Sequence, residues 1–183
     1  MKLIDRWALM RNTTIEDVAQ HTMQVAIIAH ALCEIENKLY GGKLDAEKAA
    51  VLALYHESAE VVTGDLPTPV KYYDTDINKA YKNIESRAEK KLIETLPDEL
   101  KDCFSPFVQP DKSLPEYRMV KCADKLSALI KCAEELAVGN KEFKNAYDST
   151  LKILSAAPEK SVKYFIDVFM PAYSESLDYL LDE

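Results

Sequence analysis

The chain has 183 residues, 48% of them hydrophobic and 30% charged, with a net charge of −8 and no basic tract. This length suits one folded unit, so we expect a single domain over residues 1–183. The acidic balance argues against a nucleic acid polymer as a partner, because affinity for such polymers comes mostly from neutralising their phosphates.

Apolar residues recur at helical spacing along most of the chain, and no alternating strand pattern with an Asn-Gly hairpin turn occurs, which predicts an all-α fold. With their capping residues, the expected helices cover about residues 2–10, 14–39, 45–62, 74–96, 97–108, 115–139, 141–155 and 159–181. Thr14 and Asp17 precede the second helix at the spacing of capping residues. Pro115 suits the first position of its helix, and Pro171 should kink or divide the last one.

Prolines interrupt the helical pattern between the third and fourth of these helices. The segment LPTPVKYY, residues 66–73, contains Pro67 and Pro69. Each proline disfavours a helical conformation in the residue before it. An irregular segment is therefore expected here.

A histidine and two glutamates end the third helix, in the otherwise apolar segment AAVLALYHESAEVV. His56 and Glu60 are four residues apart, and Glu57 is rotated about 100° from His56, so the three side chains share one sector. Burying carboxylates is costly unless a cation compensates them, and no Lys or Arg lies within one turn. Either a divalent metal compensates them, or the helix end reaches the surface and water solvates them.

Two further histidines lie on the long helix that precedes this one. His21 is set among apolar residues in VAQHTMQVAIIAHAL, as either a metal ligand or a hydrogen-bonded core residue. His30 follows nine residues later, roughly 180° around the helix, so both cannot face one metal. We expect His30 to be a packing or surface residue.

An aspartate in the helix after Pro115 is a further candidate ligand. Asp124 lies in EYRMVKCADKLSALIKCAEEL, next to apolar positions. Lys121 precedes it by three residues on the same helix, so an ion pair between the two is the alternative to a ligand role. The local pattern leaves both interpretations open.

The order His21, His56–Glu57 and Asp124 resembles the H…HD…D pattern of the HD-domain metal-dependent phosphohydrolases. Four longer segments extend the likeness to the bacterial 5′-deoxynucleotidases: LIDRWALMRNT, VAQHTMQVAIIAHAL, YHESAEVVTGDLPTPVKYY and KCADKLSALIKCAEELAVGN. The resemblance covers nearly the whole chain and implies an HD-domain helical bundle. One position departs from the pattern, because Glu57 stands where the family has Asp. Glu keeps the charge and the oxygen ligand but is one methylene longer, which bears on metal preference and affinity.

The resemblance implies a role for each motif residue in the metal site. His21, His56, Glu57 and Asp124 correspond to the ligands of a divalent ion, and two imidazoles with two carboxylates suit Co, Mn or another borderline transition metal. Glu60 matches the family's catalytic acid, which orients water and passes a proton to the leaving 5′-oxygen. The alternative for Glu60 is to hold a metal ligand in place.

The resemblance also implies the residues that bind substrate. Arg6 matches the arginine that orients the phosphate in catalysis, with a surface ion pair to Asp5 as the alternative. Trp7 matches a residue that walls the sugar or base, with a core anchor as the alternative. Glu57 borders the same pocket. The family's substrate loop corresponds to Asp65, Leu66, Pro67 and Thr68. By this resemblance, Asp65 accepts a hydrogen bond from a sugar hydroxyl, and Pro67 and Thr68 form a wall that excludes a 2′-hydroxyl. The alternative is that these residues form a plain Pro-rich turn.

The function implied is the removal of the 5′-phosphate from deoxyribonucleoside 5′-monophosphates, by a homodimer. Two alternatives stay open: hydrolysis of another nucleotide, or a non-catalytic nucleotide-sensing protein whose metal site Glu57 has altered. No apolar run approaches the length of a membrane span, so no membrane partner is expected. The four cysteines form no C-x-x-C pair, which is typical of reduced thiols in a cytoplasmic protein.

Overall fold

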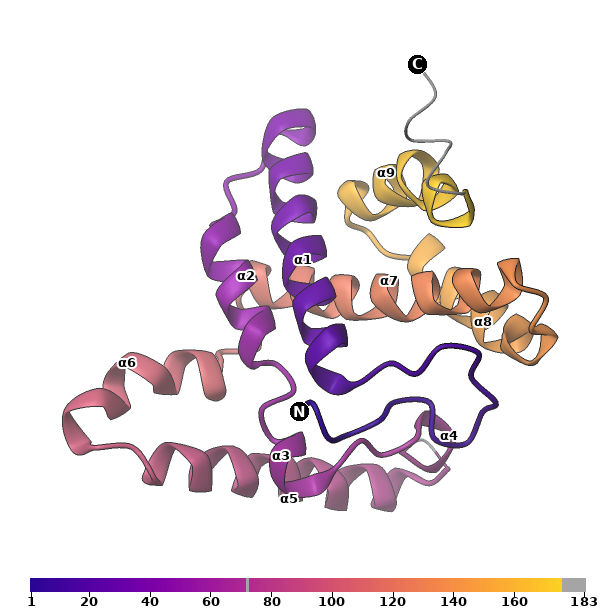
Figure 1. Ribbon diagram of the computed structural model, residues 1–183. Helices are drawn as coiled ribbons and strands as arrows, with labels where there is room; N and C mark the ends of the chain where they lie inside the picture. Colours follow the sequence, from indigo (N-terminus) through magenta and orange to yellow (C-terminus); the bar gives the residue numbers. More distant parts are fainter. Residues whose placement is uncertain (72, 176–183) are drawn as a thin grey trace.

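The computed structural model describes residues 1–71 and 73–175, and within these ranges every regular element is helical (Figure 1). The elements are α1 (Val18–Tyr40), α2 (Ala46–Tyr55), α3 (Glu60–Thr63), α4 (Thr68–Lys71), α5 (Thr75–Glu94), α6 (Asp98–Val108), α7 (Pro115–Ala137), the 3₁₀ turn η1 (Lys141–Phe143), α8 (Lys144–Ser155), α9 (Lys160–Val168) and the 3₁₀ turn η2 (Met170–Ser174). The predicted all-α fold is confirmed.

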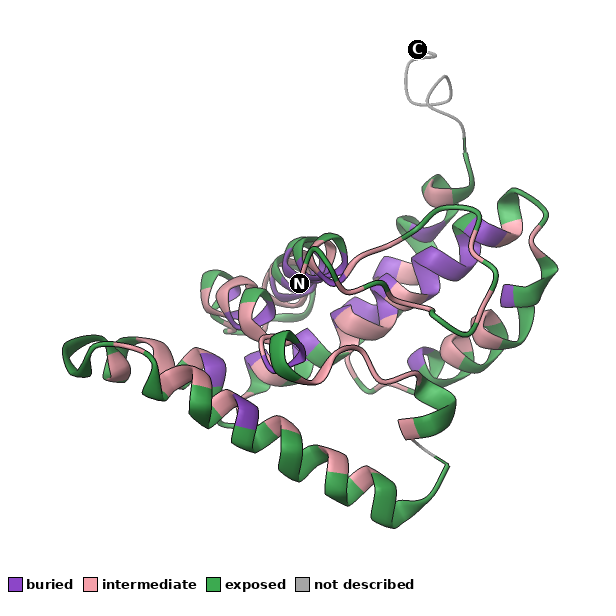
Figure 2. Ribbon diagram, turned by 60° about the horizontal axis from the view of Figure 1, so that its bottom comes forward, coloured by how far each residue is buried: buried purple, intermediate pink, exposed green. Residues whose placement is uncertain are grey.

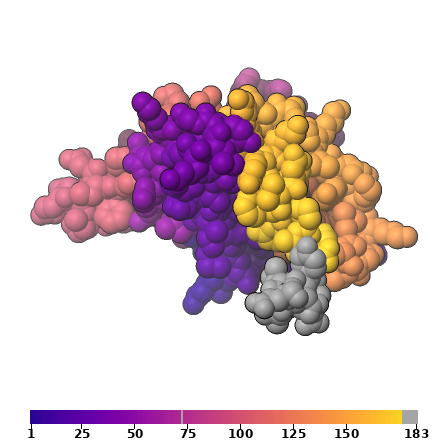
Figure 3. All heavy atoms as spheres, turned by 90° about the horizontal axis from the view of Figure 1, so that it is seen from above, coloured from indigo at the N-terminus to yellow at the C-terminus, as the bar shows by residue number. Residues whose placement is uncertain are grey.

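Three helices form the centre of the molecule. Helices α1 and α2 lie side by side, and α7 crosses behind both of them (Figure 1). Their facing sides supply most of the apolar core, and residues such as Leu32, Leu52 and Leu126 are at most 1% exposed. Seen from above, α9 lies between α1 and α8 and closes this core on one side (Figure 3). The fold thus brings one end of α1, one end of α2 and the middle of α7 together.

Helix termini follow the sequence signals in most places. Asp17 caps α1, accepting a hydrogen bond from the backbone N–H of Gln20, whose side chain bonds back to the Asp17 backbone. The capping box is therefore formed by Asp17 with Gln20, so the second helix begins after Asp17 and not after Thr14. Pro115 occupies the first turn of α7, as predicted.

The helix predicted over residues 2–10 does not form. This segment instead runs beside the start of α1, where the Arg6 N–H donates to the Glu16 carbonyl at 2.9 Å and the Val18 N–H donates to the Ile4 carbonyl at 3.0 Å. Trp7 has φ = 60°, which is outside the helical region. Pairing with the residues before α1 satisfies the backbone groups that a short isolated helix would have satisfied within itself.

The helix predicted over residues 45–62 breaks into two. Helix α2 ends at Tyr55, and the next backbone hydrogen bonds reach back only three residues, from Ser58 to Tyr55 and from Glu60 to Glu57, both at 3.0 Å. Helix α3 then covers Glu60–Thr63. The assumption of one continuous helix for His56 and Glu60 was therefore wrong, because the chain tightens where the polar residues begin.

The segment predicted to be irregular, residues 66–73, contains one helical turn, α4. The N–H groups of Val70 and Lys71 both donate to the Pro67 carbonyl, at 2.9 and 3.0 Å. Pro69 lies in the first turn of α4, where a missing N–H costs no helical hydrogen bond. Prolines therefore start this turn where they were expected to prevent it.

Helices α5 and α6 form an arm at one edge of the molecule. Helix α5 packs on α3, α4 and α6, and Ala88 is its single buried residue, so most of its length is exposed (Figure 2). Near the end of the described chain, the last predicted helix divides at Phe169, between α9 and η2, and Pro171 lies in the first turn of η2. The part of the predicted helix after residue 175 lies outside the described residues. No described helix combines the length and apolar character that crossing a membrane requires.

Candidate active site

Four side chains converge where the N-terminal end of α1, the C-terminal end of α2 and the middle of α7 meet. His21 comes from the first turns of α1, His56 and Glu57 from the turn that ends α2, and Asp124 from α7. One donor atom from each lies within 4.8 Å of every other. The structure therefore brings together all four residues that the sequence suggested as metal ligands.

Hydrogen bonds fix the orientation of both imidazole rings. His56 Nδ1 lies 2.6 Å from the carbonyl of Ala53, which can only accept, so this nitrogen carries the proton. His21 Nδ1 lies 3.0 Å from Ser127 Oγ, and that hydroxyl donates its own proton to Gln24 Oε1. Both rings therefore turn Nδ1 toward these partners and direct Nε2 toward the centre of the cluster.

The two Nε2 atoms are buried and have no hydrogen-bond partner among the described residues. His21 Nε2 lies 3.2 Å from Asp124 Oδ1, and His56 Nε2 lies 3.3 Å from Glu57 Oε1. Each contact requires a cation or a proton between the nitrogen and the carboxylate oxygen. Without a cation, burial opposes protonation of His21, but the contact with Asp124 raises the pKa of His21 above its usual value. The donor set thus fits a divalent cation.

Both carboxylates of the cluster are anionic at neutral pH. Burial opposes ionisation of Glu57, but its contact with His56 lowers the pKa of Glu57 to about 2. Burial likewise opposes ionisation of Asp124, and the charge of Lys121 holds the pKa of Asp124 well below its usual value. Lys121 Nζ is 3.0 Å from Asp124 Oδ2, while Oδ1 faces His21. The ion pair and a ligand role thus use different oxygens of Asp124.

Glu60 lies beside the cluster at the start of α3 and is 6% exposed. Its Oε2 has no hydrogen-bond partner among the described residues. Burial, followed by the charge of Glu57, raises the pKa of Glu60 to about 9. Glu60 is therefore a protonated carboxyl group at neutral pH when no cation is bound nearby.

The N-terminal segment places Arg6 and Trp7 near the cluster. The Arg6 side chain is 12% exposed, and its Nε lies 3.4 Å from Glu16 Oε1, so its ionic partner is Glu16 and the alternative pair with Asp5 was wrong. The charge of Arg6 acts on the pKa of both Glu60 and Asp65. Trp7 packs on Phe143, with ring centroids 5.3 Å apart, as a core anchor would.

The loop that joins α3 to α4 is anchored from α5. Gly64 has φ = 70°, a conformation that favours glycine, and its carbonyl accepts a hydrogen bond of 3.0 Å from the hydroxyl of Tyr81. The four residues that the sequence assigned to substrate binding follow directly: Asp65, Leu66, Pro67 and Thr68. The first three of these are half-buried, and the last is exposed at the start of α4.

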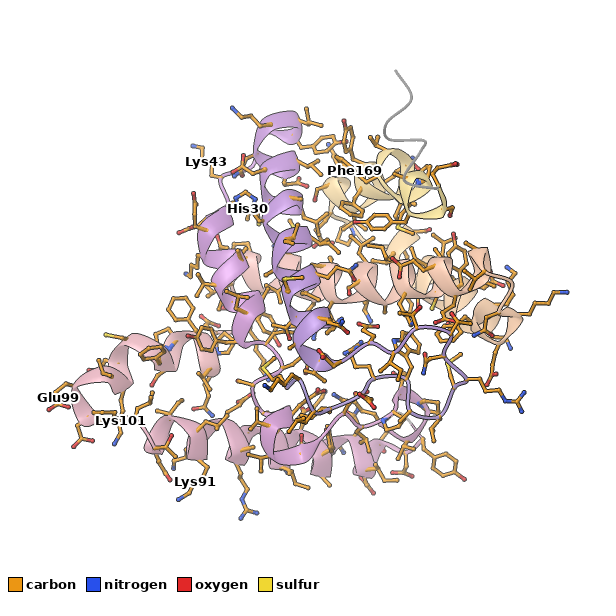
Figure 4. The ribbon with its side chains drawn as sticks, viewed as in Figure 1. His30, Lys43, Lys91, Glu99, Lys101 and Phe169 are labelled. Atoms are coloured by element: carbon orange, nitrogen blue, oxygen red, sulfur yellow. The ribbon has the colours of Figure 1, made fainter. Side chains whose placement is uncertain are left out.

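Sequence reasoning missed several residues that support the site. Ser127 orients His21 and lies three residues after Asp124, so helical spacing would have placed both on one face of α7. Glu16 and Tyr81 carry no local signal, because their partners are remote in sequence. His30 is exposed and belongs to the part of α1 remote from His21, in agreement with its predicted role as a surface residue (Figure 4).

Comparisons with known proteins agree with this geometry. The family model described as 5′-deoxynucleotidase YfbR-like matches residues 1–173. Curated proteins named 5′-deoxynucleotidase YfbR from Salmonella arizonae and Salmonella typhi are each 49% identical over 179 residues, which is 97% of this chain and 90% of theirs.

Solved structures share the fold. An HD-domain phosphohydrolase from Listeria innocua superimposes with a TM-score of 0.83 at 24% identity, over 100% of this chain and 88% of that one. A protein from Pyrococcus horikoshii has a TM-score of 0.69 at 23% identity, over 94% of this chain and 92% of that one. At these identities the likeness establishes the HD-domain fold alone.

Proposed function

The chain belongs to the family of YfbR-like 5′-deoxynucleotidases, and on that premise we propose that it hydrolyses deoxyribonucleoside 5′-monophosphates to deoxynucleosides and phosphate. The observation that carries the proposal is the convergence of His21, His56, Glu57 and Asp124, whose donor atoms lie within 4.8 Å of one another. A phosphomonoester carries two negative charges, so a site for its hydrolysis needs concentrated positive charge, which this donor set is suited to bind.

We propose that these four side chains hold one divalent ion. When bound, the ion supplies the charge that polarises a phosphate and lowers the pKa of water. Two imidazoles and two carboxylates favour a borderline ion, and Co or Mn are the proposed candidates. Glu57 in place of the family's Asp keeps the ligand charge, and its Oε1 already lies 3.3 Å from His56 Nε2. The longer side chain therefore reaches the cluster, and we propose that it acts as a ligand.

Glu60 is proposed as the catalytic acid. Its carboxyl group is buried, and the charge of the adjacent Glu57 favours the protonated form. A cation held by Glu57 offsets the repulsion but leaves the burial in place, so a proton on Glu60 remains available. That proton would pass to the leaving 5′-oxygen when the phosphorus–oxygen bond breaks.

Arg6 is proposed to bind the phosphate. Its planar guanidinium suits two phosphate oxygens, and its charge already acts on Glu60 and Asp65. Trp7 would border the sugar or base. Asp65 would accept a hydrogen bond from a sugar hydroxyl, and Leu66, Pro67 and Thr68 would form the wall that excludes a 2′-hydroxyl.

We further propose a homodimer and a cytoplasmic location. All four cysteines are free in the structure, which suits a reducing compartment. The dimer is an inference from the family alone. Sedimentation at micromolar concentration would test it, and a monomer would remove this part of the proposal.

The proposed reaction is tested by phosphate release from a panel of nucleotides with a series of divalent ions. Deoxyadenosine and thymidine 5′-monophosphates should release phosphate, whereas adenosine 5′-monophosphate should not. Equal rates with the ribonucleotide would remove the deoxy-specific claim and favour hydrolysis of another nucleotide. Metal binding without any phosphate release would favour a nucleotide-sensing protein.

A further inference from the structure

Glu16 contacts three residues of the proposed site with a single carboxylate. Its Oε1 lies 3.4 Å from Arg6 Nε and 3.4 Å from His21 Nδ1. Its Oε2 accepts a hydrogen bond of 3.0 Å from Trp7 Nε1. The Glu16 side chain is 14% exposed, so these contacts are largely shielded from water. The Glu16 carboxylate therefore lies between the residues proposed to bind the phosphate (Arg6), to border the sugar or base (Trp7) and to bind the metal (His21).

The backbone around Glu16 ties the same elements together. Its carbonyl accepts the Arg6 N–H at 2.9 Å, and Asp5 and Asp17 form an isolated antiparallel bridge. Asp17 is also the N-cap of α1, the helix that carries His21. The position of the Glu16 side chain is thus fixed relative to both the N-terminal segment and the first turns of α1.

Trp7 needs such a restraint because its backbone is strained. A φ of 60° is unusual for a bulky residue and persists only where surrounding contacts enforce it. Four contacts do so: the bond to Glu16, the packing on Phe143, and two hydrogen bonds to the Trp7 carbonyl, from the Met10 N–H at 2.9 Å and from Asn12 Nδ2 at 3.3 Å. Glu16 is the charged member of this set and the one that also reaches the metal-facing histidine.

Glu16 contacts only part of the Arg6 guanidinium group. Arg6 Nε is buried and makes no hydrogen bond of good geometry, although the Glu16 carboxylate lies 3.4 Å away. Within the described ranges, the terminal nitrogens of Arg6 donate no hydrogen bond. Glu16 thus neutralises the inner edge of the guanidinium and leaves its outer edge free to bind two phosphate oxygens.

We propose that Glu16 is a positioning residue of the hydrolase site, which aligns Arg6 and Trp7 for the nucleotide and orients His21 for the metal. This proposal rests on the proposed function. Glu16 touches neither substrate nor metal in this arrangement. It acts through Arg6 and Trp7 on one side and through the Nδ1 of His21 on the other.

The test uses Glu16→Gln, which keeps the shape of the side chain and removes its charge. Trp7 is the single tryptophan of the chain, so intrinsic fluorescence reports on this contact directly. We expect the emission maximum of Glu16→Gln to move to longer wavelength and acrylamide quenching to increase. The Co²⁺ dissociation constant and kcat/KM for deoxyadenosine 5′-monophosphate should each worsen by about tenfold or more, the usual cost of losing a group that orients a ligand.

Two further variants separate positioning from a general loss of structure. Glu134→Gln removes the same charge from an exposed position close enough to act on Glu16, and should leave emission, Co²⁺ affinity and kcat/KM at wild-type values. Ser127→Ala removes the other partner of His21 Nδ1, so it should weaken Co²⁺ binding and leave Trp7 emission unchanged. If Glu16→Gln fails to fold by circular dichroism, Glu16→Asp, which retains the charge on a shorter side chain, takes its place.

A double-mutant cycle decides whether Glu16 acts through Arg6. In an Arg6→Ala background, Glu16→Gln should lower kcat/KM at saturating Co²⁺ by less than about threefold, because contacting residues are not additive. Full additivity, or a Trp7 emission identical to wild type in Glu16→Gln, would overturn the proposal. The Trp7 fluorescence and the Co²⁺ dissociation constant can both be measured without catalytic activity. A wild-type protein that releases no phosphate would therefore refute the proposed reaction while these two readouts still decide the role of Glu16.

Discussion

His56 and Glu57 are adjacent in sequence, yet both reach one centre: His56 Nε2 lies 3.3 Å from Glu57 Oε1. Neighbours on a regular helix diverge by about 100°. Helix α2 has ended at Tyr55, and the following turn brings the two side chains together. The departure from the family's His-Asp pair is thus accommodated locally.

This arrangement predicts how substitutions of Glu57 behave. Glu57→Gln removes a ligand charge and should weaken Co²⁺ binding by at least about 100-fold, more than is usual for a change outside the ligand set. Glu57→Asp keeps the charge and should retain phosphate release within about tenfold of wild type. Calorimetric titration and a phosphate assay give the two values. A rise from near zero activity in Glu57→Asp would mean that Glu57 had disabled the site.

Glu60→Gln should stabilise the metal-free protein and abolish hydrolysis. Burial, then the charge of Glu57, raises the pKa of Glu60 from 4.5 to about 9, so the unfolded chain loses this proton first. The stability that comes from protonated Glu60 is complete below pH 4.5 and is lost as pH rises toward 9. Glutamine resembles the protonated group, so the variant should gain about 1–3 kcal/mol at neutral pH.

Urea unfolding in EDTA at pH 5 and pH 8 measures this effect of Glu60→Gln. The advantage of the variant should grow between the two values. A gap that stays constant or shrinks would show that Glu60 is ionised in the folded protein. Phosphate release by the metal-loaded variant supplies the second half of the test.

Glu135 anchors the N-terminal segment and should be sensitive to substitution. It accepts hydrogen bonds from the backbone N–H groups of Thr13 and Thr14 and from Asn140, and it pairs with the buried Lys131. Glu135→Ala would leave Lys131 buried without its partner and should cost about 3–5 kcal/mol of unfolding free energy. The exposed pair of Lys144 and Asp148 provides the control, since Asp148→Ala should cost less than about 1 kcal/mol.

Glu135 should also contribute to the loss of stability of the folded protein at low pH. Burial opposes its ionisation, but the hydrogen bond with Lys131 and those of Asn140 and Thr13 lower the pKa of Glu135 from 4.5 to about 2. A depressed pKa contributes stability that is present above 4.5 and is lost as pH falls toward 2. The thermal stabilities of wild type and Glu135→Gln should therefore converge as pH falls from 4.5 toward 2. A difference that stays constant down to pH 2 would contradict this origin.

Tyr81→Phe should loosen the proposed substrate loop. The Tyr81 hydroxyl donates to the carbonyl of Gly64 at 3.0 Å, directly before Asp65. Without that hydrogen bond, we expect KM for deoxyadenosine 5′-monophosphate to rise about threefold to tenfold, in line with a net loss of about 1 kcal/mol. Discrimination against the ribonucleotide should fall in parallel. Unchanged discrimination would mean that the wall does not select the sugar.

Local signals predicted the long elements well, because α1, α5 and α7 carry sustained helical periodicity, and each begins at a capping aspartate or, for α7, at a proline. They failed for residues 2–10, where hydrogen bonds to residues 16–18 replace the helix, and after Tyr55, where the chain tightens into turns. Both departures lie beside the cluster. At both places, contacts between residues that are far apart in sequence override local helix propensity, so a short stretch of sequence cannot reveal them.

The candidate site shows the same division. Spacing and the family pattern found the four converging side chains, because each lies in a recognisable segment. Glu16 and Tyr81 were not predicted, because the role of an isolated glutamate or tyrosine depends on partners that are remote in sequence. Ser127 lay within reach of helical spacing from Asp124. Residues that bind can thus be found from motifs, whereas residues that position them need the fold.

We propose that four side chains from three parts of the chain bind one divalent ion. The most direct measurement is a titration of EDTA-stripped protein with Co²⁺, followed by the visible absorption of the bound ion. We expect saturation at one Co²⁺ per chain, with the signal lost in His21→Ala and in Asp124→Asn. Absence of Co²⁺ binding by the wild type, or unchanged binding in both variants, would contradict it.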